Sequence, residues 1–291
     1  MYNRTAAVAA PLLTGLILAL APPGVDAQDW RDMTSFRQLS DETRVDVRVR
    51  YGAGEFMIRA GEPGELYRAN LQYDAEVFDP RIEYRRGHLE VGVEGRDGKL
   101  RLRNTKAGEL RLHLSPEVPL EMDLDFGAVE ADLDLTGLQV ASLDVETGAS
   151  ETRLRFGEAN PAVCDRLKIA MGAAAFTARG LGHAGCRDMK VEGGVGDLTL
   201  EFDGTWPRDI EADIAMALGS VTLVVPEDIG VRVDKDTFLI SFDRSRFYKR
   251  GSSYYSDNWD SASRRLTLHM EGAFGSINVR WAPPTAAAVT P

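Results

Sequence analysis

Alternation of apolar and polar residues, repeated in one phase, is the feature that most limits what this chain can fold into. Val45, Val47, Val49 and Tyr51 form one such run, and similar runs recur along the chain. A period of two indicates strands with one buried face, whereas helices show a period near 3.6. Almost no stretch after residue 27 has the helical period. The sequence therefore predicts an all-β protein.

Seven segments fit one template centred on a small residue. Mostly apolar residues stand five, three and one positions before it, and four and six positions after it. A second small residue follows two positions after the centre in six of the seven segments, with Val129 as the exception. The central residues are Gly52, Gly127, Gly148, Gly172, Gly194, Ala217 and Ala273. From Gly127 to Ala217 they are 21, 24, 22 and 23 residues apart.

This spacing predicts a stacked single-chain β-solenoid, β-helix-like, with about 22 residues per coil. One coil cannot bury its apolar face by itself, but stacked coils align their inward residues into a continuous core. Glycine permits a bend where a side chain would clash or where φ must be positive. An ordinary β-sandwich is the alternative, since it also gives strands every 8–12 residues. A sandwich gives no reason for the shared phase.

Irregular spacing at both ends of the template suggests the domain organisation. Gly52 and Gly127 are 75 residues apart, so residues 28–115 are expected to form a separate N-terminal β unit. Residues 116–281 would form the solenoid. Ala217 and Ala273 are 56 residues apart because an insertion separates them. Residues 282–291 are rich in Ala, Pro and Thr, which is typical of a disordered tail.

Residues 1–27 are predicted to be a secretory signal peptide. Arg4 precedes the apolar run "LLTGLILALA", and small residues stand before Gln28 where cleavage would occur. A membrane anchor is the alternative, but prolines bracket the run and it is shorter than the roughly 20 residues of a span. We expect an exported protein of the bacterial periplasm or cell surface, with no membrane span after cleavage. Its net charge of −11 argues against nucleic acid as a partner.

The two cysteines of the chain occupy the same phase. Cys164 lies eight residues before Gly172, and Cys186 lies eight residues before Gly194. Equivalent positions in stacked coils are about 4.8 Å apart, within the roughly 4.4–6.8 Å Cα range of a disulfide. An exported protein meets an oxidising compartment. We therefore predict a Cys164–Cys186 disulfide, and a stacked pair of buried thiols is the alternative.

Sequence motifs for catalysis or metal binding are few. No paired-histidine zinc motif, nucleophile elbow or phosphate-binding loop occurs. Asp123, Asp125, Asp132 and Asp134 alternate with apolar residues and are expected to point outward, where neighbouring carboxylates could act on a glycan or bind Ca²⁺. Outward acids on strands are more often only solvated, and they oppose aggregation. The sequence thus predicts no enzyme and no cofactor.

The insertion at residues 243–265 concentrates aromatic and basic side chains on an acidic chain. Such side chains are common where a protein contacts a protein or a sugar. Capping of the last coil is an equally physical role, and the two roles are compatible. The candidate residues for interaction or capping are Phe247, Tyr248, Arg250, Tyr254, Tyr255 and Trp259.

Two parts of the chain resemble known families over most of residues 40–281. The segments "VRYGAGEFMIRAG" and "LYRANLQYDAEVFDPRIEY" resemble the N-terminal domain of the toast-rack family of bacterial extracytoplasmic proteins. "ALGSVTLVVPEDIGVRVD" and "YYSDNWDSASRRLTLHMEGAFGSINV" resemble the C-terminal region of LiaF-like cell-wall-active antibiotic response proteins. The resemblance implies a β-helical or stacked-sheet fold at the cell envelope. LiaF-like proteins carry transmembrane helices before this region, where this chain has the predicted signal peptide.

These observations favour an exported, non-enzymatic scaffold or interaction protein of the cell envelope, with a role in envelope stress response as one possibility. Its partner would be an envelope protein or a cell-surface glycan. An adhesin-like glycan-binding or surface-binding module is the second interpretation, and a β-helix carbohydrate-active enzyme is a distant third. The sequence specifies no oligomeric state.

Overall fold

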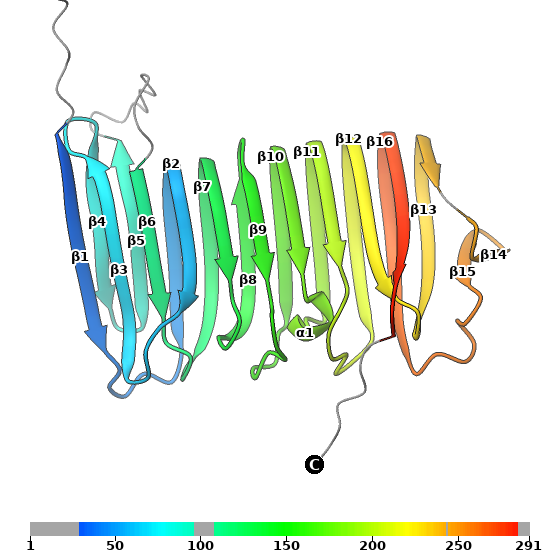
Figure 1. Cartoon of the computed structure of the whole chain (residues 1–291), viewed down its shortest axis with the longest axis horizontal. Helices are drawn as coiled ribbons and strands as arrows, with labels where there is room; N and C mark the ends of the chain where they lie inside the picture. The colour runs from blue at the N-terminus through cyan, green and yellow to red at the C-terminus, as the bar shows by residue number, and fades with distance from the viewer. Residues whose placement is uncertain (1–28, 96–107, 243, 285–291) are drawn as a thin grey trace, which may run out of the picture.

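The computed structural model describes residues 29–95, 108–242 and 244–284 (Figure 1). The predicted signal peptide, Asp243 and most of the predicted tail lie outside these ranges. The strands are β1 (Trp30–Gln38), β2 (Val45–Ala60), β3 (Glu65–Asp74), β4 (Phe78–Arg85), β5 (His88–Gly95), β6 (Gly108–Leu114), β7 (Pro119–Asp134), β8 (Gln139–Thr147), β9 (Glu151–Arg155), β10 (Arg166–Arg179), β11 (Asp188–Glu201), β12 (Ile210–Pro226), β13 (Ile229–Phe242), β14 (Phe247–Arg250), β15 (Ser253–Ser256) and β16 (Arg264–Ala282). Among the described residues the one helix is α1 (Leu181–Ala184), so the predicted all-β class is confirmed.

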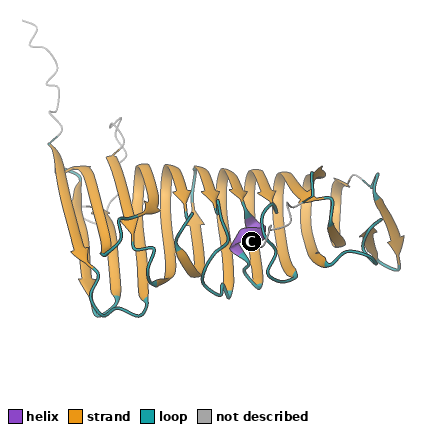
Figure 2. Ribbon diagram, turned by 60° about the horizontal axis from the view of Figure 1, so that its bottom comes forward, coloured by secondary structure: helices purple, strands orange, loops and turns teal. Residues whose placement is uncertain are grey.

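The strands stand side by side in one long sheet. Its central run is parallel, in the order β2, β7, β8, β10, β11, β12, β16, β13. Figure 2 shows the long strands curving over along one edge, so that the two halves of a strand form two walls around a shared core. β8 and β9 together take the place of one such strand, since β9 pairs with the second halves of β7 and β10.

The template positions meet in register across the parallel run. Tyr51 pairs with Phe126, which precedes Gly127, and Met216 pairs with Gly272, which precedes Ala273. Apolar side chains of equal phase therefore stack into buried rows. The row three positions before the central residue contains Val49, Leu124, Val145, Ile169, Val191, Ile214 and Met270. Each of them is at most 2% exposed, so these rows form the core.

The order of the strands departs from a simple stack at both ends. β16, the last strand, lies between β12 and β13 and is parallel to both. Antiparallel pairs flank the parallel run, with β1, β3 and β6 at one end and β13, β15 and β14 at the other. The sheet is therefore mixed. The boundary predicted between residues 28–115 and 116–281 stays a prediction, and β2 pairs with β7 across it over Val45–Ile58.

Where the residue two positions after the centre of the template is glycine, it has a positive φ angle, as at Gly54, Gly196, Gly219 and Gly275. Gly196 and Gly219 have φ values of +142° and +141°, a region that favours glycine. A Cβ on Gly219 would lie 1.8 Å from the carbonyl oxygen of Gly196. The bend is thus held by two small residues. The central residue lets the neighbouring strand approach closely, since a Cβ on Gly127 would lie 2.4 Å from the Gly52 oxygen. The second small residue, where it is glycine, adopts the positive φ.

Candidate functional site

The predicted disulfide joins Cys164 and Cys186, with their Cα atoms 4.4 Å apart. Both residues are buried in the connections that lead into β10 and β11. The backbone of the second connection also bonds to the first, because the Arg187 amide donates to the Cys164 carbonyl at 3.1 Å. The bridge therefore links two neighbouring connections along the edge opposite the bend.

The four aspartates proposed as outward carboxylates are divided between the two walls. Asp123 and Asp125 precede the bend at Gly127, and Asp132 and Asp134 follow it. Asp123 accepts from Arg48 at 3.2 Å, and Asp132 accepts from Arg59 at 2.5 Å. No group of three or more His, Cys, Asp or Glu side chains among the described residues could hold a metal ion. Asp123, Asp132 and Asp134 therefore lie in separate cross-strand ion pairs instead of one cluster.

The insertion folds as a β-hairpin of β14 and β15 at the end of the stack. Tyr248 stands opposite Tyr255, and Lys249 stands opposite Tyr254. β15 also pairs with β13 at two positions, so the hairpin covers part of an exposed sheet edge. Because neighbouring residues of a strand face opposite ways, the hairpin has an inner and an outer face.

The inner face of the hairpin packs against the end of the core. Tyr254 is 7% exposed and its ring contacts Phe242, with centroids 5.4 Å apart. Phe247 contacts both Phe242 and Trp281. These contacts are what a cap of the last strands requires.

The outer face carries an aromatic and cationic cluster, which we call the end-face cluster and define as Tyr248, Arg250, Tyr255 and Trp259. The Tyr248 and Tyr255 rings stack with centroids 5.9 Å apart, and Trp259 meets Tyr255 edge-on at 5.3 Å. The Arg250 guanidinium lies over both tyrosine rings at 5.5 and 5.3 Å. Arg232 lies over Tyr255, and Arg265 lies over Trp259.

The one charged member of the end-face cluster, Arg250, has an acidic neighbour. Arg250 also contacts Asp260 at 3.3 Å, in an exposed ion pair of the kind that contributes little stability. The three rings are half-buried, so each keeps part of its surface exposed to solvent. Stacked aromatic rings beside guanidinium groups can contact sugar faces, aromatic side chains or carboxylates. The sequence identified these residues, but their division between two faces depends on the strand pairing.

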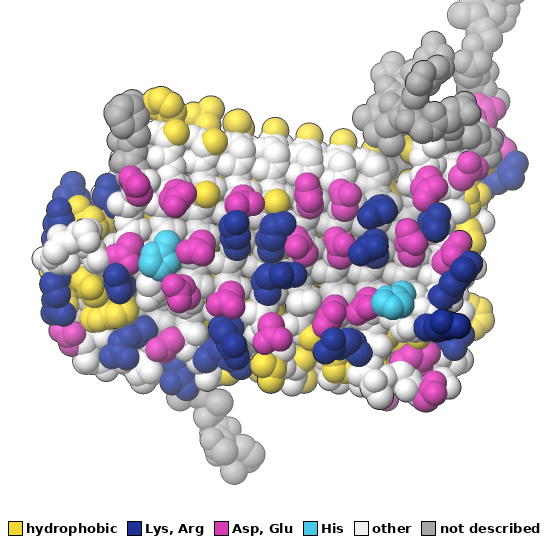
Figure 3. All heavy atoms as spheres, turned by 180° about the vertical axis from the view of Figure 1, so that it is seen from behind, with side chains coloured by type: hydrophobic (Ala, Val, Ile, Leu, Met, Phe, Trp, Pro, Cys, Tyr) yellow, Lys and Arg dark blue, Asp and Glu magenta, His cyan; other side chains and the backbone are white. Residues whose placement is uncertain are grey.

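Sequence reasoning missed a second surface, which lies along the bend. The residue directly after each central residue points outward, and from Ala149 onward it is always apolar. We call Ala149, Ala173, Val195, Leu218 and Phe274 the apolar ridge. Val195, Leu218 and Phe274 are 50%, 48% and 49% exposed, and Figure 3 shows apolar side chains along this edge. Large apolar residues directly after the small residue of the template were the available signal.

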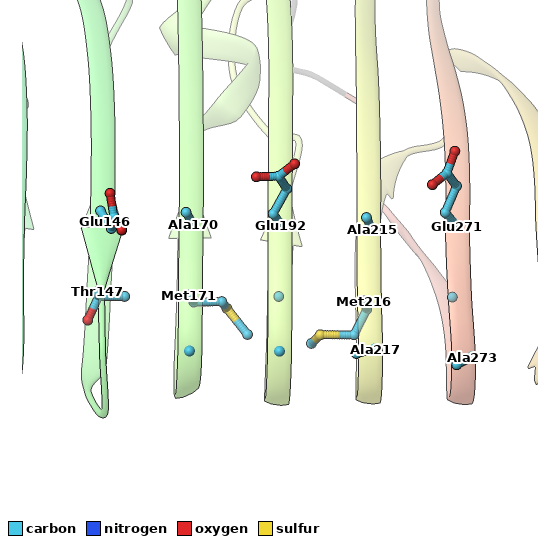
Figure 4. Close-up of a pocket in the computed structure, with 14 residues that line it drawn as sticks. Glu146, Thr147, Ala170, Met171, Glu192, Ala215, Met216, Ala217, Glu271 and Ala273 are labelled. Carbon is cyan, nitrogen blue, oxygen red and sulfur yellow. The ribbon is translucent and has the colours of Figure 1, made fainter.

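A shallow groove of about 650 Å³ runs beside the apolar ridge, across β8, β10, β11, β12 and β16. Gly172, Gly194, Ala217 and Ala273 contribute to its floor, together with the buried Met171 and Met216. Figure 4 shows Glu146, Glu192 and Glu271 along its far side, with Ala170 and Ala215 on the strands between them. The groove therefore has a small, apolar floor and an acidic far wall.

Two family models match the chain. The N-terminal domain of toast_rack, DUF2154, matches residues 26–179, and the C-terminal domain of the cell wall-active antibiotics response protein LiaF matches residues 184–279. No curated protein matches the chain. Within residues 29–95, 108–242 and 244–284, no helix is long and apolar enough to cross a bilayer.

Matches to solved structures include three bacterial proteins. A candidate cell adhesion protein from Clostridium sporogenes is 16% identical, with a TM-score of 0.46 over 87% of this chain and 100% of its own. A candidate adhesin from Bacteroides fragilis is 9% identical, with a TM-score of 0.34 over 86% and 97%. A candidate lipid-binding protein from Parabacteroides distasonis is 11% identical, with a TM-score of 0.34 over 89% and 98%.

Proposed function

The chain belongs to the toast-rack family, and from this premise we propose that it is an exported, non-enzymatic interaction protein of the bacterial cell envelope. The match of its second half to a cell wall-active antibiotics response domain supports an envelope role. Export agrees with the disulfide between Cys164 and Cys186, because such bonds persist in oxidising compartments. Within this proposal the parallel run acts as a solenoid with coils of about 22 residues.

The observation that carries the proposal is the end-face cluster. Its outer rings and guanidinium groups cover an end of the stack that the inner residues Phe247 and Tyr254 already close. The cap would need only that inner face. A second layer of partly exposed aromatic and arginine side chains is the composition of a binding hot spot. We therefore assign capping to the inner face and contact with an envelope protein to the outer face.

A cell-surface glycan is the second candidate ligand, because the stacked Tyr248 and Tyr255 rings present an aromatic surface on which a sugar ring could lie. The two ligands differ in chemistry. A protein partner would use the arginines as well as the rings, whereas a neutral glycan would depend mainly on the rings. Substitution of each set separately tells them apart.

The test compares the chain with a triple variant, Tyr248→Ser, Tyr255→Ser and Trp259→Ser, by cross-linking to isolated envelope proteins and by binding to cell-wall glycan. The matched control is Phe36→Ser, because Phe36 is an exposed ring (57%) under Arg68 on β1 at the opposite end. We expect the triple variant to keep its fold by circular dichroism and lose cross-linking, while the control keeps it. Equal cross-linking by the triple variant would refute the proposal. Binding to glycan only, lost in the triple variant but kept by Arg250→Gln, would transfer the function to the second candidate.

A further inference from the structure

The apolar ridge exposes more hydrophobic surface than the chain needs for folding. Val195, Leu218 and Phe274 are each about half exposed and lie on consecutive strands, because Val195 pairs with Leu218 and Leu218 pairs with Phe274. Single exposed apolar residues are common, but a contiguous row beside a groove indicates an interaction site. These three side chains point away from the core and are not part of its rows.

Carboxylates flank the ridge on both sides. Glu146, Glu192 and Glu271 line the far wall of the groove. Glu151 and Asp197 follow the bend on the other wall. Lys190 forms an ion pair with Glu192 at 2.8 Å, whereas no ion pair with Glu146 or Glu271 is found among the described residues. The groove thus has negative charge available to a ligand at its two ends.

The dimensions of the groove match those of a helix. The glutamate row lies two residues before the central residue and the ridge lies one residue after it, so a helix laid across the strands at the bend can contact both. Glu146, Glu192 and Glu271 occupy every second strand, about 9.6 Å apart. One heptad of a helix advances about 10.5 Å. Two heptads cover about 21 Å, against about 19 Å from the first glutamate strand to the last.

We propose that this groove binds a basic amphipathic helix from another protein, whose apolar face packs on the ridge and the groove floor. Basic side chains at heptad spacing along one edge of that helix meet the row of glutamates. This surface is distinct from the end-face cluster, and its function does not depend on the proposed one.

A second copy of the chain does not fit as the occupant. Two ridges placed face to face would bring the acidic rows of one molecule against those of the other. Like charges directly opposite one another across an interface repel and disfavour the complex. The net charge of −11 also makes two copies of the chain repel each other. A basic helix instead places positive charge against the glutamate row.

The test measures binding of a synthetic 15-residue helical peptide, with Leu on one face and Lys beside it at heptad spacing, to the purified chain by fluorescence anisotropy. The ridge variant is Leu218→Ser with Phe274→Ser, and the wall variant is Glu146→Gln with Glu271→Gln. The matched control for the ridge is Phe36→Ser. The matched control for the wall is Glu62→Gln with Glu158→Gln, because both are exposed acids in loops that do not line the groove. We expect each groove variant to weaken binding about tenfold and each control to leave it unchanged. Added salt should weaken binding to the wild-type chain more than to the wall variant.

Several results would overturn the proposal. One is absence of saturable binding, and another is equal binding of a peptide with Glu in place of Lys. Equal loss in the control variants would place the peptide elsewhere on the acidic surface. A dimer in sedimentation that is lost in the ridge variant would make a second copy the occupant. Ridge-dependent binding to phosphatidylglycerol vesicles without peptide binding would make a membrane the occupant.

Discussion

Replacement of Gly219 by alanine tests the packing of the bend most directly. Gly219 has a φ of +141°, and a Cβ there would lie 1.8 Å from the Gly196 oxygen and 2.9 Å from its carbonyl carbon. The dihedral by itself costs a non-glycine residue about 1–3 kcal/mol. Moving the two strands apart to relieve the contact weakens ladder hydrogen bonds, at about 1 kcal/mol each. We expect Gly219→Ala to lower the free energy of unfolding by about 3–5 kcal/mol.

The matched control is Gly64→Ala, since Gly64 also has a positive φ, +81°, but has no atom within 4 Å of the added Cβ. It should lose only about 1–2 kcal/mol, the cost of the left-handed conformation. Guanidinium unfolding, followed by tryptophan fluorescence and circular dichroism without reductant, measures both variants. Equal losses would refute the reasoning. The bend would then be able to adopt the conformation of Ala174, which occupies the same template position without a positive φ.

Three further predictions concern the core and the connections. Cys164→Ala with Cys186→Ala should lower the free energy of unfolding by about 3 kcal/mol, because the bridge closes a loop with a separation of 22 residues; a loss under about 1 kcal/mol in guanidinium would contradict this entropic estimate. Tyr51 is buried, and its hydroxyl has no hydrogen-bond partner among the described residues. Burial raises the pKa of Tyr51, and Glu109 and Glu55 raise it further. The stability it contributes is present below its unfolded pKa of about 10 and is lost as the pH rises beyond that value. Tyr51→Phe should therefore flatten the fall in unfolding free energy above about pH 10, and an unchanged slope would exclude Tyr51 as its source. Asn160 bonds to the Val140 amide at 3.0 Å and to the Val140 and Ala184 carbonyls at 2.8 and 3.2 Å. Asn160→Ala should cost about 2–3 kcal/mol in urea unfolding, and a neutral result would mean that water replaces the amide.

The core could be predicted because burial imposes a rule on sequence. Rows such as Val145, Ile169 and Val191 must be apolar at every second position, and their shared phase follows from the in-register parallel pairing. The position of the cysteines followed from the same phase. The clash at the central glycines was also predictable, whereas the positive φ two residues later depends on local geometry that alternation does not encode.

The order of the strands could not be predicted in the same way. All template segments share one residue pattern, and their strands pair through backbone groups that are the same in each. Nothing in the pattern therefore indicates that β16 pairs with both β12 and β13. The end-face cluster and the groove also differ in how readily the sequence reveals them. The end-face cluster was visible as an unusual composition, but the groove consists of Gly, Ala and Glu positions that belong to the regular template. Only their alignment across five strands produces a surface.

The position of β16 has a consequence for biosynthesis. A chain that is made from its N-terminus delivers β13 before the strand that joins it to the rest of the stack. Until residues 264–282 emerge, β12 and β13 each present an open edge of 14 or more residues. Such edges recruit other chains during folding. Pairing of β16 with both edges is thus the step that closes this part of the sheet.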